Sequence, residues 1–146
     1  LSELKECIER LFAMNVVPIV NENDVVSKEA MSEELAFSDN DGLAALCAMH
    51  FNADLLILLT DVDGIYTDNP KSNKGAKKIN GISDLNSASI IIGAKSKYGL
   101  GGVHSKIMAV KKVHAAGCNV VVARAKKNAV LSVISGKSEG SIFMRD

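Results

Sequence analysis

The sequence has few aromatic residues and no excess of charge of either sign. Aromatic side chains make up 4% of the 146 residues, and tryptophan is absent, so surfaces on which nucleic-acid bases could stack are scarce. Lysine plus arginine and aspartate plus glutamate each number 17, which leaves a formal net charge of zero. Without a basic field that neutralises phosphates, we expect no nucleic-acid partner.

Long apolar runs and paired cysteines are also missing. The longest apolar stretches have about six residues, far fewer than the roughly twenty that span a bilayer, so no membrane partner is expected. Cys7, Cys47 and Cys118 are odd in number and lack a C-x-x-C motif. Each is predicted to be a small buried side chain. The three histidines have no metal-ligand spacing, so no metal site is expected.

Patterns typical of helices and strands alternate along the chain. The apolar periodicity predicts helices at 3–14, 41–51, from the turn at 99–102 to about 116, and at 127–135. Predicted strands are 16–20, 55–59, 119–123 and 141–144, with shorter ones at 35–37 and 89–92. The run 55–59 is typical of a strand buried on both faces. This order predicts an α/β fold in which helices cover both faces of a parallel sheet.

Polar residues follow three of the predicted strands. In parallel α/β sheets, ligands bind outside the carboxyl ends of the strands. Residues 21–24, the pair Thr60–Asp61 and Arg124 occupy these positions. The pattern therefore predicts that all three groups line one cleft.

Three polar or glycine-rich clusters each allow two interpretations. The glycines before Lys106 fit either a phosphate-binding helix start or a flexible hinge. Residues 38–41 either cap a helix or carry a carboxylate that orients catalytic cations. Residues 21–24 are polar enough for a site but also typical of an ordinary turn. The D-x-D-G sequence at 61–64 lacks the remaining ligands of a calcium loop.

Taken together, these segments resemble the glutamate 5-kinases of the amino-acid kinase family. The matching sequences are V-P-I-V-N-E-N-D at 17–24, D-N-D at 39–41, L-L-T-D-V-D-G-I-Y-T at 58–67, and the glycine-rich stretch through Lys106. Residues 93–99 are similar to the kinase half of bifunctional pyrroline-carboxylate synthases. The resemblance covers essentially the whole chain. It implies a three-layer αβα sandwich with a mainly parallel sheet, the carbamate kinase-like fold, incomplete at its N-terminus.

The resemblance also implies roles for individual residues. Lys106 would stabilise the transferring phosphoryl group, and Asp41 would organise the catalytic lysines. Asp24 and Asn40 would hold the substrate glutamate, with Asn21 beside them. The residues implied in nucleotide binding are Thr60, Asp61, Leu100, Gly101, Gly102, Val103, His104, Ser105 and Lys106.

The implied reaction transfers the γ-phosphoryl group of ATP to the side-chain carboxylate of L-glutamate, with Mg²⁺ present, as the first step towards proline. We expect a homo-oligomer in the intact protein. The expected location is the cytoplasm, or the mitochondrion for a bifunctional eukaryotic-type synthase. The alternatives are an acetylglutamate, aspartate or uridylate kinase, and a non-catalytic module that binds nucleotide.

Two departures from the family pattern affect these expectations. Leu100 stands where the family has a hydroxyl residue, so one phosphate contact is in question. The chain begins at Leu1, without the glycine-rich loop and second catalytic lysine that family members carry near their start. We therefore expect residues 1–146 to be the C-terminal, nucleotide-binding part of one amino-acid kinase domain, inactive on its own.

Overall fold

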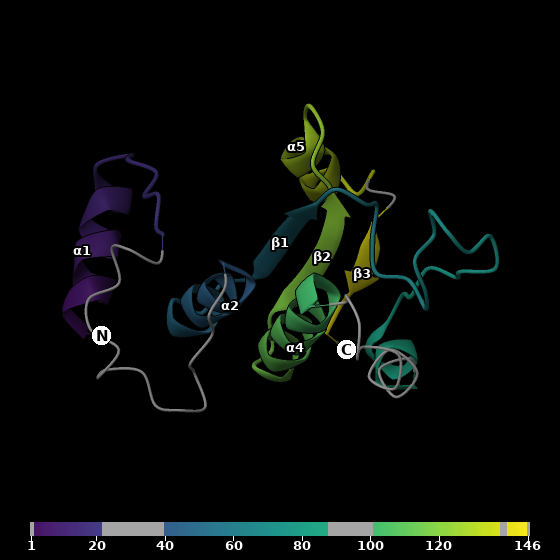
Figure 1. Cartoon of the computed structure of the whole chain (residues 1–146). Coiled ribbons are helices and arrows are strands. Elements are labelled where there is room, and N and C mark those ends of the chain that lie inside the picture. The colour runs from purple at the N-terminus through teal and green to yellow at the C-terminus, as the bar shows by residue number, and fades with distance from the viewer. Residues whose placement is uncertain (1, 22–39, 88–100, 138–139, 146) are drawn as a thin grey trace.

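A computed structural model describes residues 2–21, 40–87, 101–137 and 140–145. The labelled helices are α1 (Ser2–Ala13), α2 (Asn40–His50), α4 (Gly101–Ala115) and α5 (Ala129–Ile134), and the strands are β1 (Leu55–Thr60), β2 (Asn119–Arg124) and β3 (Ser141–Phe143) (Figure 1). Residues 82–87 are also helical. The seven labelled elements confirm the corresponding sequence predictions. The short strands predicted at 35–37 and 89–92 lie outside the described residues.

The three strands form one mixed sheet in the order β1-β2-β3. β1 and β2 are parallel, with Leu55 opposite Asn119 and Thr60 opposite Arg124. β3 runs antiparallel to β2, with Phe143 opposite Val120. The sheet is therefore parallel only in part, and its two parallel strands end side by side at Thr60 and Arg124.

The two faces of the sheet are covered unequally. Leu56, Leu58, Val120 and Val122 point into a large core that α2 and α4 complete. On the other face, Val133 of the short helix α5 packs against Val121 and Ala123. The prediction that β1 is buried on both faces was wrong, since Leu59 is 44% exposed. A helix of six residues is too short to cover both parallel strands on that side.

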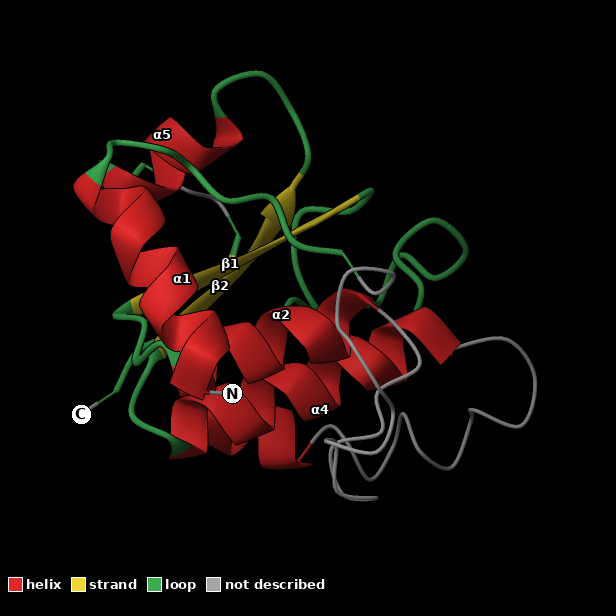
Figure 2. Ribbon diagram, turned by 90° about the vertical axis from the view of Figure 1, so that its left-hand side faces the viewer, coloured by secondary structure: helices red, strands yellow, loops and turns green. Residues whose placement is uncertain are grey.

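Helices α2 and α4 lie side by side beneath the sheet (Figure 2). The buried residues of α2 are Gly42, Ala45 and Ala48, and small side chains let two helix backbones approach closely. Ile107, Val110 and Val113 of α4 are fully buried or nearly so. This close packing brings the first turns of both helices together. None of the described helices combines the length and the apolar character needed to cross a membrane.

The N-terminal region departs from two predictions. Helix α1 ends as expected at Asn15, which has a φ of 57°. Residues 16–20 form no strand, because they pair with no other described segment, and Val17 and Ile19 are 83% and 91% exposed. Cys7 is exposed, while Cys118 is buried and Cys47 is half-buried. The expectation that all three cysteines are buried was therefore wrong for Cys7, whose side of α1 the other described elements leave open.

Candidate nucleotide site

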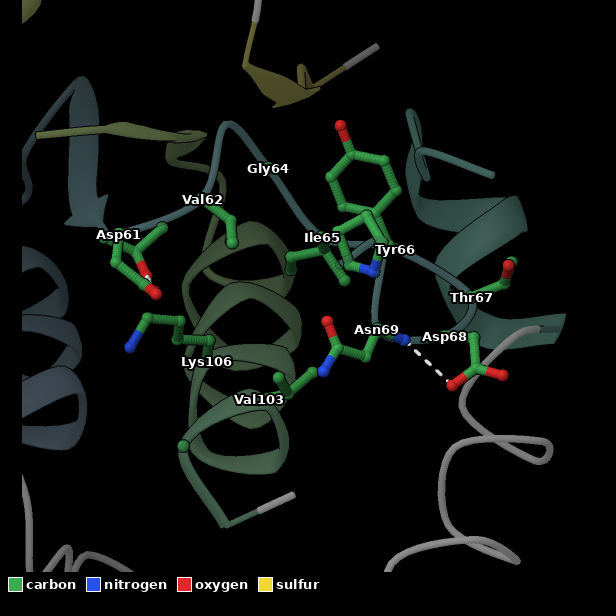
Figure 3. A pocket seen from close by; sticks show the side chains of 13 residues that line it. Asp61, Val62, Gly64, Ile65, Tyr66, Thr67, Asp68, Asn69, Val103 and Lys106 are labelled. Atoms are coloured by element: carbon green, nitrogen blue, oxygen red, sulfur yellow. Dashed lines mark hydrogen bonds between the residues drawn. The ribbon is translucent and has the colours of Figure 1, made fainter. Parts of the chain in front are cut away.

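A cavity of about 320 Å³ opens where β1 ends and α4 begins. Its walls come from three segments: the end of β1 and the loop after it, the following residues up to Pro70, and the first turns of α4 (Figure 3). The lining residues are Thr60, Asp61, Val62, Gly64, Ile65, Tyr66, Thr67, Asp68, Asn69, Pro70, Gly102, Val103 and Lys106. The cavity thus has the place that parallel α/β sheets give to their ligands.

Lys106 lines this cavity and is held by Asp41 of α2. Its Nζ donates a hydrogen bond of 2.8 Å to Oδ2 of Asp41, and Ser105 Oγ donates one of 3.0 Å to the same oxygen. The side chains of Lys106 and Asp41 are only 20% and 17% exposed. Such a charge-assisted hydrogen bond fixes the position of the ammonium group.

Asp61 forms a second, more exposed ion pair at the cavity. Oδ2 of Asp61 accepts a hydrogen bond of 3.1 Å from Nζ of Lys71, and Oδ1 accepts one of 3.2 Å from Thr60 Oγ1. The hydrogen bond from Lys71 lowers the pKa of the Asp61 carboxyl group. The carboxylate is therefore ionised at neutral pH.

Sequence reasoning missed one wall of the cavity. Tyr66 and Lys78, 12 positions apart, form an isolated antiparallel bridge that no local sequence pattern predicted. Asp63 contacts both residues of this bridge, since it accepts hydrogen bonds from Lys78 Nζ at 2.7 Å and from Tyr66 Oη at 2.8 Å. The two bonds, Lys78 first, lower the pKa of Asp63 to about 2. The apolar Ile79, 2% exposed between polar neighbours, was the one signal of this turn back to the fold.

Gly64 and Ser141 fasten the same wall to β3. Gly64 has a φ of 149°, and a Cβ atom there would lie 2.6 Å from Ser141 Oγ, so glycine is required. The fully buried Ser141 hydroxyl accepts a hydrogen bond of 2.9 Å from the backbone N–H of Ile65. The loop after β1 is thereby held against the sheet.

The glycine-rich stretch divides between the cavity and its surroundings. Gly102, Val103 and Lys106 line the cavity, and Gly101 is the first residue of α4. Ser105 instead contacts Asp41, and His104 is exposed and outside the lining. Leu100 lies outside the described residues.

The predicted substrate residues lie at a different cavity. Asn21 and Asn40 both line a space of about 480 Å³ between α1 and α2. Asn40 directly precedes Asp41, whose carboxylate holds Lys106 at the cavity beside β1. Asp24 lies outside the described residues.

The prediction of one shared cleft was wrong. Asn21, Thr60–Asp61 and Arg124 line three separate cavities, and residues 22–24 lie outside the described residues. The loop after β1 divides two of these cavities, since Asp61, Val62 and Gly64 line one of them and Asp63 lines the other. Within the described ranges, no group of three or more histidine, cysteine, aspartate or glutamate side chains could hold a metal ion.

Comparison with known proteins decides the family. The sequence profile of the amino acid kinase family matches residues 2–124. The chain belongs to the amino-acid kinase family.

Relatives within this family carry two names. The chain is 36% identical over 140 residues to a glutamate 5-kinase of Enterococcus faecalis, covering 94% of the chain and 52% of the relative. It is 38% identical to a delta-1-pyrroline-5-carboxylate synthase of Mesembryanthemum crystallinum, covering 99% of the chain and 21% of the relative. The chain therefore spans about half the length of the glutamate 5-kinase that it matches.

A solved structure confirms the amino-acid kinase fold. The carbamate kinase of Giardia lamblia bound to AMP-PNP superposes with a TM-score of 0.57 at 21% identity, over 74% of this chain and 36% of that one. The predicted α/β class and carbamate kinase-like fold are thus confirmed.

Proposed function

We propose that this chain is the nucleotide-binding part of a glutamate 5-kinase, which transfers the γ-phosphoryl group of ATP to the side-chain carboxylate of L-glutamate. The observation that carries the proposal is a lysine, Lys106, fixed by Asp41 at the wall of a cavity at the carboxyl end of β1. Similarity to glutamate 5-kinases over nearly the whole chain supports the choice of substrate.

In this proposal the cavity at β1 holds ATP. Backbone N–H groups in the first turn of α4 face its phosphates, and the helix dipole adds partial positive charge there. The AMP-PNP in the similar carbamate kinase structure supports a nucleotide in this fold. Mg²⁺ would enter with the nucleotide and neutralise phosphate charge.

Lys106 would act during the transfer step. A carboxylate oxygen of glutamate attacks the γ-phosphorus, the bond from that phosphorus to the β–γ bridging oxygen breaks, and ADP leaves with the bond electrons. The products are glutamyl 5-phosphate and ADP. Phosphoryl transfer needs mainly positioning and positive charge. The Lys106 ammonium supplies that charge, and Asp41 and Ser105 keep it in place.

Glutamate would bind near Asn21, Asp24 and Asn40. Amide side chains both donate and accept hydrogen bonds, as recognition of an amino acid requires. The cavity shared by Asn21 and Asn40 supports this placement. We propose a cytoplasmic enzyme whose full catalytic domain extends beyond these residues, so that the 146-residue chain alone binds nucleotide without efficient turnover.

The test measures ADP formation by the full-length kinase with L-glutamate, N-acetyl-L-glutamate, L-aspartate and UMP as separate acceptors. We expect activity with L-glutamate alone. Activity with another acceptor instead of L-glutamate would contradict the proposed substrate and identify that acceptor in its place. AMP-PNP binding without activity on any acceptor would favour a non-catalytic module. Calorimetric titration of the 146-residue chain with AMP-PNP should show binding, and ADP formation by it at the rate of the full-length kinase would contradict its predicted inactivity.

A further inference from the structure

A second cavity at the carboxyl end of the sheet is lined by cations that the proposed kinase reaction does not use. It has a volume of about 320 Å³ and lies at the end of β2, beside α5. Arg124, Lys126 and Lys137 line it together with Asp63, the small residues Ala123 and Ala129, and Ser132. Its lining shares no residue with the cavity that holds Lys106.

The charge around this cavity is uncompensated. Residues 124–137 contain four cationic side chains and no aspartate or glutamate, although the whole chain is neutral. Within the described ranges, the ion pairs include neither Arg124, Lys126 nor Lys137. Three like charges around one cavity repel each other, and an anion placed among them would relieve that repulsion.

The carboxylate of Asp63, which also lines this cavity, does not neutralise the three cations. Asp63 lies 2.7 Å from Lys78 Nζ and also accepts the hydrogen bond from Tyr66. Its negative charge is thus balanced by a lysine outside the lining. The cavity keeps the positive charge of its own three cations.

We propose that this cavity binds a small phosphorylated anion at a site separate from the nucleotide. A guanidinium group can bind two phosphate oxygens at once, and lysines bind phosphate as point charges. The volume is at the lower end for ligand pockets, which favours a ligand the size of a phosphate ester or pyrophosphate. The inference does not depend on glutamate as the substrate.

The loop after β1 separates the two sites. Asp61, Val62 and Gly64 face the nucleotide cavity, whereas Asp63 between them faces the cationic one. An anion bound at Arg124, Lys126 and Lys137 therefore lies behind the wall of the nucleotide cavity. A nucleotide in one site should therefore not prevent an anion from binding in the other.

The test titrates inorganic pyrophosphate into the 146-residue chain by calorimetry at low salt, with AMP-PNP present at saturation. Lys126→Gln and Lys137→Gln should each weaken pyrophosphate binding about tenfold. The matched control is Lys127→Gln, which removes the same charge from the next residue, outside the lining, and should change the affinity less than about twofold. All three lysines are exposed, so the variants should fold normally.

Several outcomes would overturn the proposal. These are no pyrophosphate binding to the unmodified chain, equal weakening by Lys126→Gln and Lys127→Gln, or pyrophosphate binding that appears only when AMP-PNP is left out. Loss of pyrophosphate binding in Lys106→Gln but not in Lys126→Gln would place the anion in the nucleotide cavity instead. The effect of Lys106→Gln on AMP-PNP binding tests only the proposed nucleotide site. Failure of the proposed function can therefore be distinguished from failure of the proposed anion site.

Discussion

Two lysine–aspartate pairs border the candidate nucleotide cavity, and they differ mainly in their exposure to water. Lys106 and Asp41 are 2.8 Å apart with side chains 20% and 17% exposed. Lys71 and Asp61 are 3.1 Å apart with side chains 67% and 76% exposed. Water and salt screen the second pair, and ordering two long exposed side chains costs entropy. The same pair of residue types can therefore hold an ammonium group firmly in one place and contribute little in another.

The largest effect should come from Lys106→Gln in the full-length kinase. Loss of the ammonium group should lower kcat/KM about 100- to 1000-fold, because it removes positive charge where phosphoryl charge develops. The measurement is steady-state ADP formation with L-glutamate. Lys71→Gln is the matched control and should retain nearly full activity. An unchanged rate in Lys106→Gln would show that the buried pair matters no more for activity than the exposed pair. It would also support a non-catalytic module.

The next effect should come from Asp41→Asn. The amide keeps the size of the side chain but no longer holds the Lys106 ammonium by charge, so we expect kcat to fall by about a hundredfold. The KM for ATP should change much less, since the cavity lining is intact. Asp61→Asn is the comparison on the exposed pair and should lower kcat less. A larger change in the KM for ATP than in kcat would show that Asp41 supports nucleotide binding instead.

Buried and exposed contacts should also differ in their effect on folding. Ser141→Ala should lower the free energy of unfolding by about 1–3 kcal/mol, because the buried N–H of Ile65 loses its acceptor. Ser87→Ala removes a hydroxyl that is exposed and should change the free energy by less than about 0.5 kcal/mol. Urea unfolding of both variants measures the difference. Equal values would show that Ser141 does not fasten the loop.

Asp63 extends the comparison to acidic pH. Its pKa is about 2 in the folded chain, below the ordinary value of 3.8. A lowered folded-state pKa stabilises the fold above the unfolded value, and this contribution is lost as the pH falls through about 2. Unfolding monitored between pH 4 and pH 2 should therefore depend less on pH in Asp63→Asn than in the unmodified chain. An identical dependence would mean that the pair with Lys78 is absent in solution.

The smallest effect should come from Lys71→Gln on stability. An exposed ion pair contributes about 0–1 kcal/mol, and high salt reduces it further. We expect the free energy of unfolding to change by less than about 0.5 kcal/mol at physiological salt. Urea unfolding measures it, with Lys77→Gln as the control. A loss well above that of Lys77→Gln would show that exposure does not govern the strength of these pairs.

Helices and strands were the part of this protein that local patterns predicted well. The buried positions of α4 follow the helical period, and Asn15 and Gly117 end their helices with positive φ values. Residues 16–20 have an equally strong strand pattern. They form no strand in the structure because a strand needs a hydrogen-bonded neighbour, which no local pattern can supply.

The candidate site was predictable only in its separate pieces. Lys106 stands out because it follows a glycine-rich helix start, and Asp61 because it follows a buried strand. The contact between Asp63 and Lys78 was missed, since the two residues lie 15 positions apart and no helical or strand pattern links them. The single cleft was wrong because the strand ends alone do not show where the intervening loop turns.

The sequence by itself determined most of the described helices and strands, the family resemblance and the residue types available at the strand ends. These depend on short-range periodicity, on backbone preferences and on the order of motifs along the chain. The tertiary structure decided which charges meet. Asp41 and Lys106 are 65 positions apart and come together because small residues let α2 and α4 pack closely. Arg124 is directly opposite Thr60 in the sheet, yet it lines a separate cavity, because the loop after β1 places Asp61, Val62 and Gly64 along one cavity and Asp63 along the other.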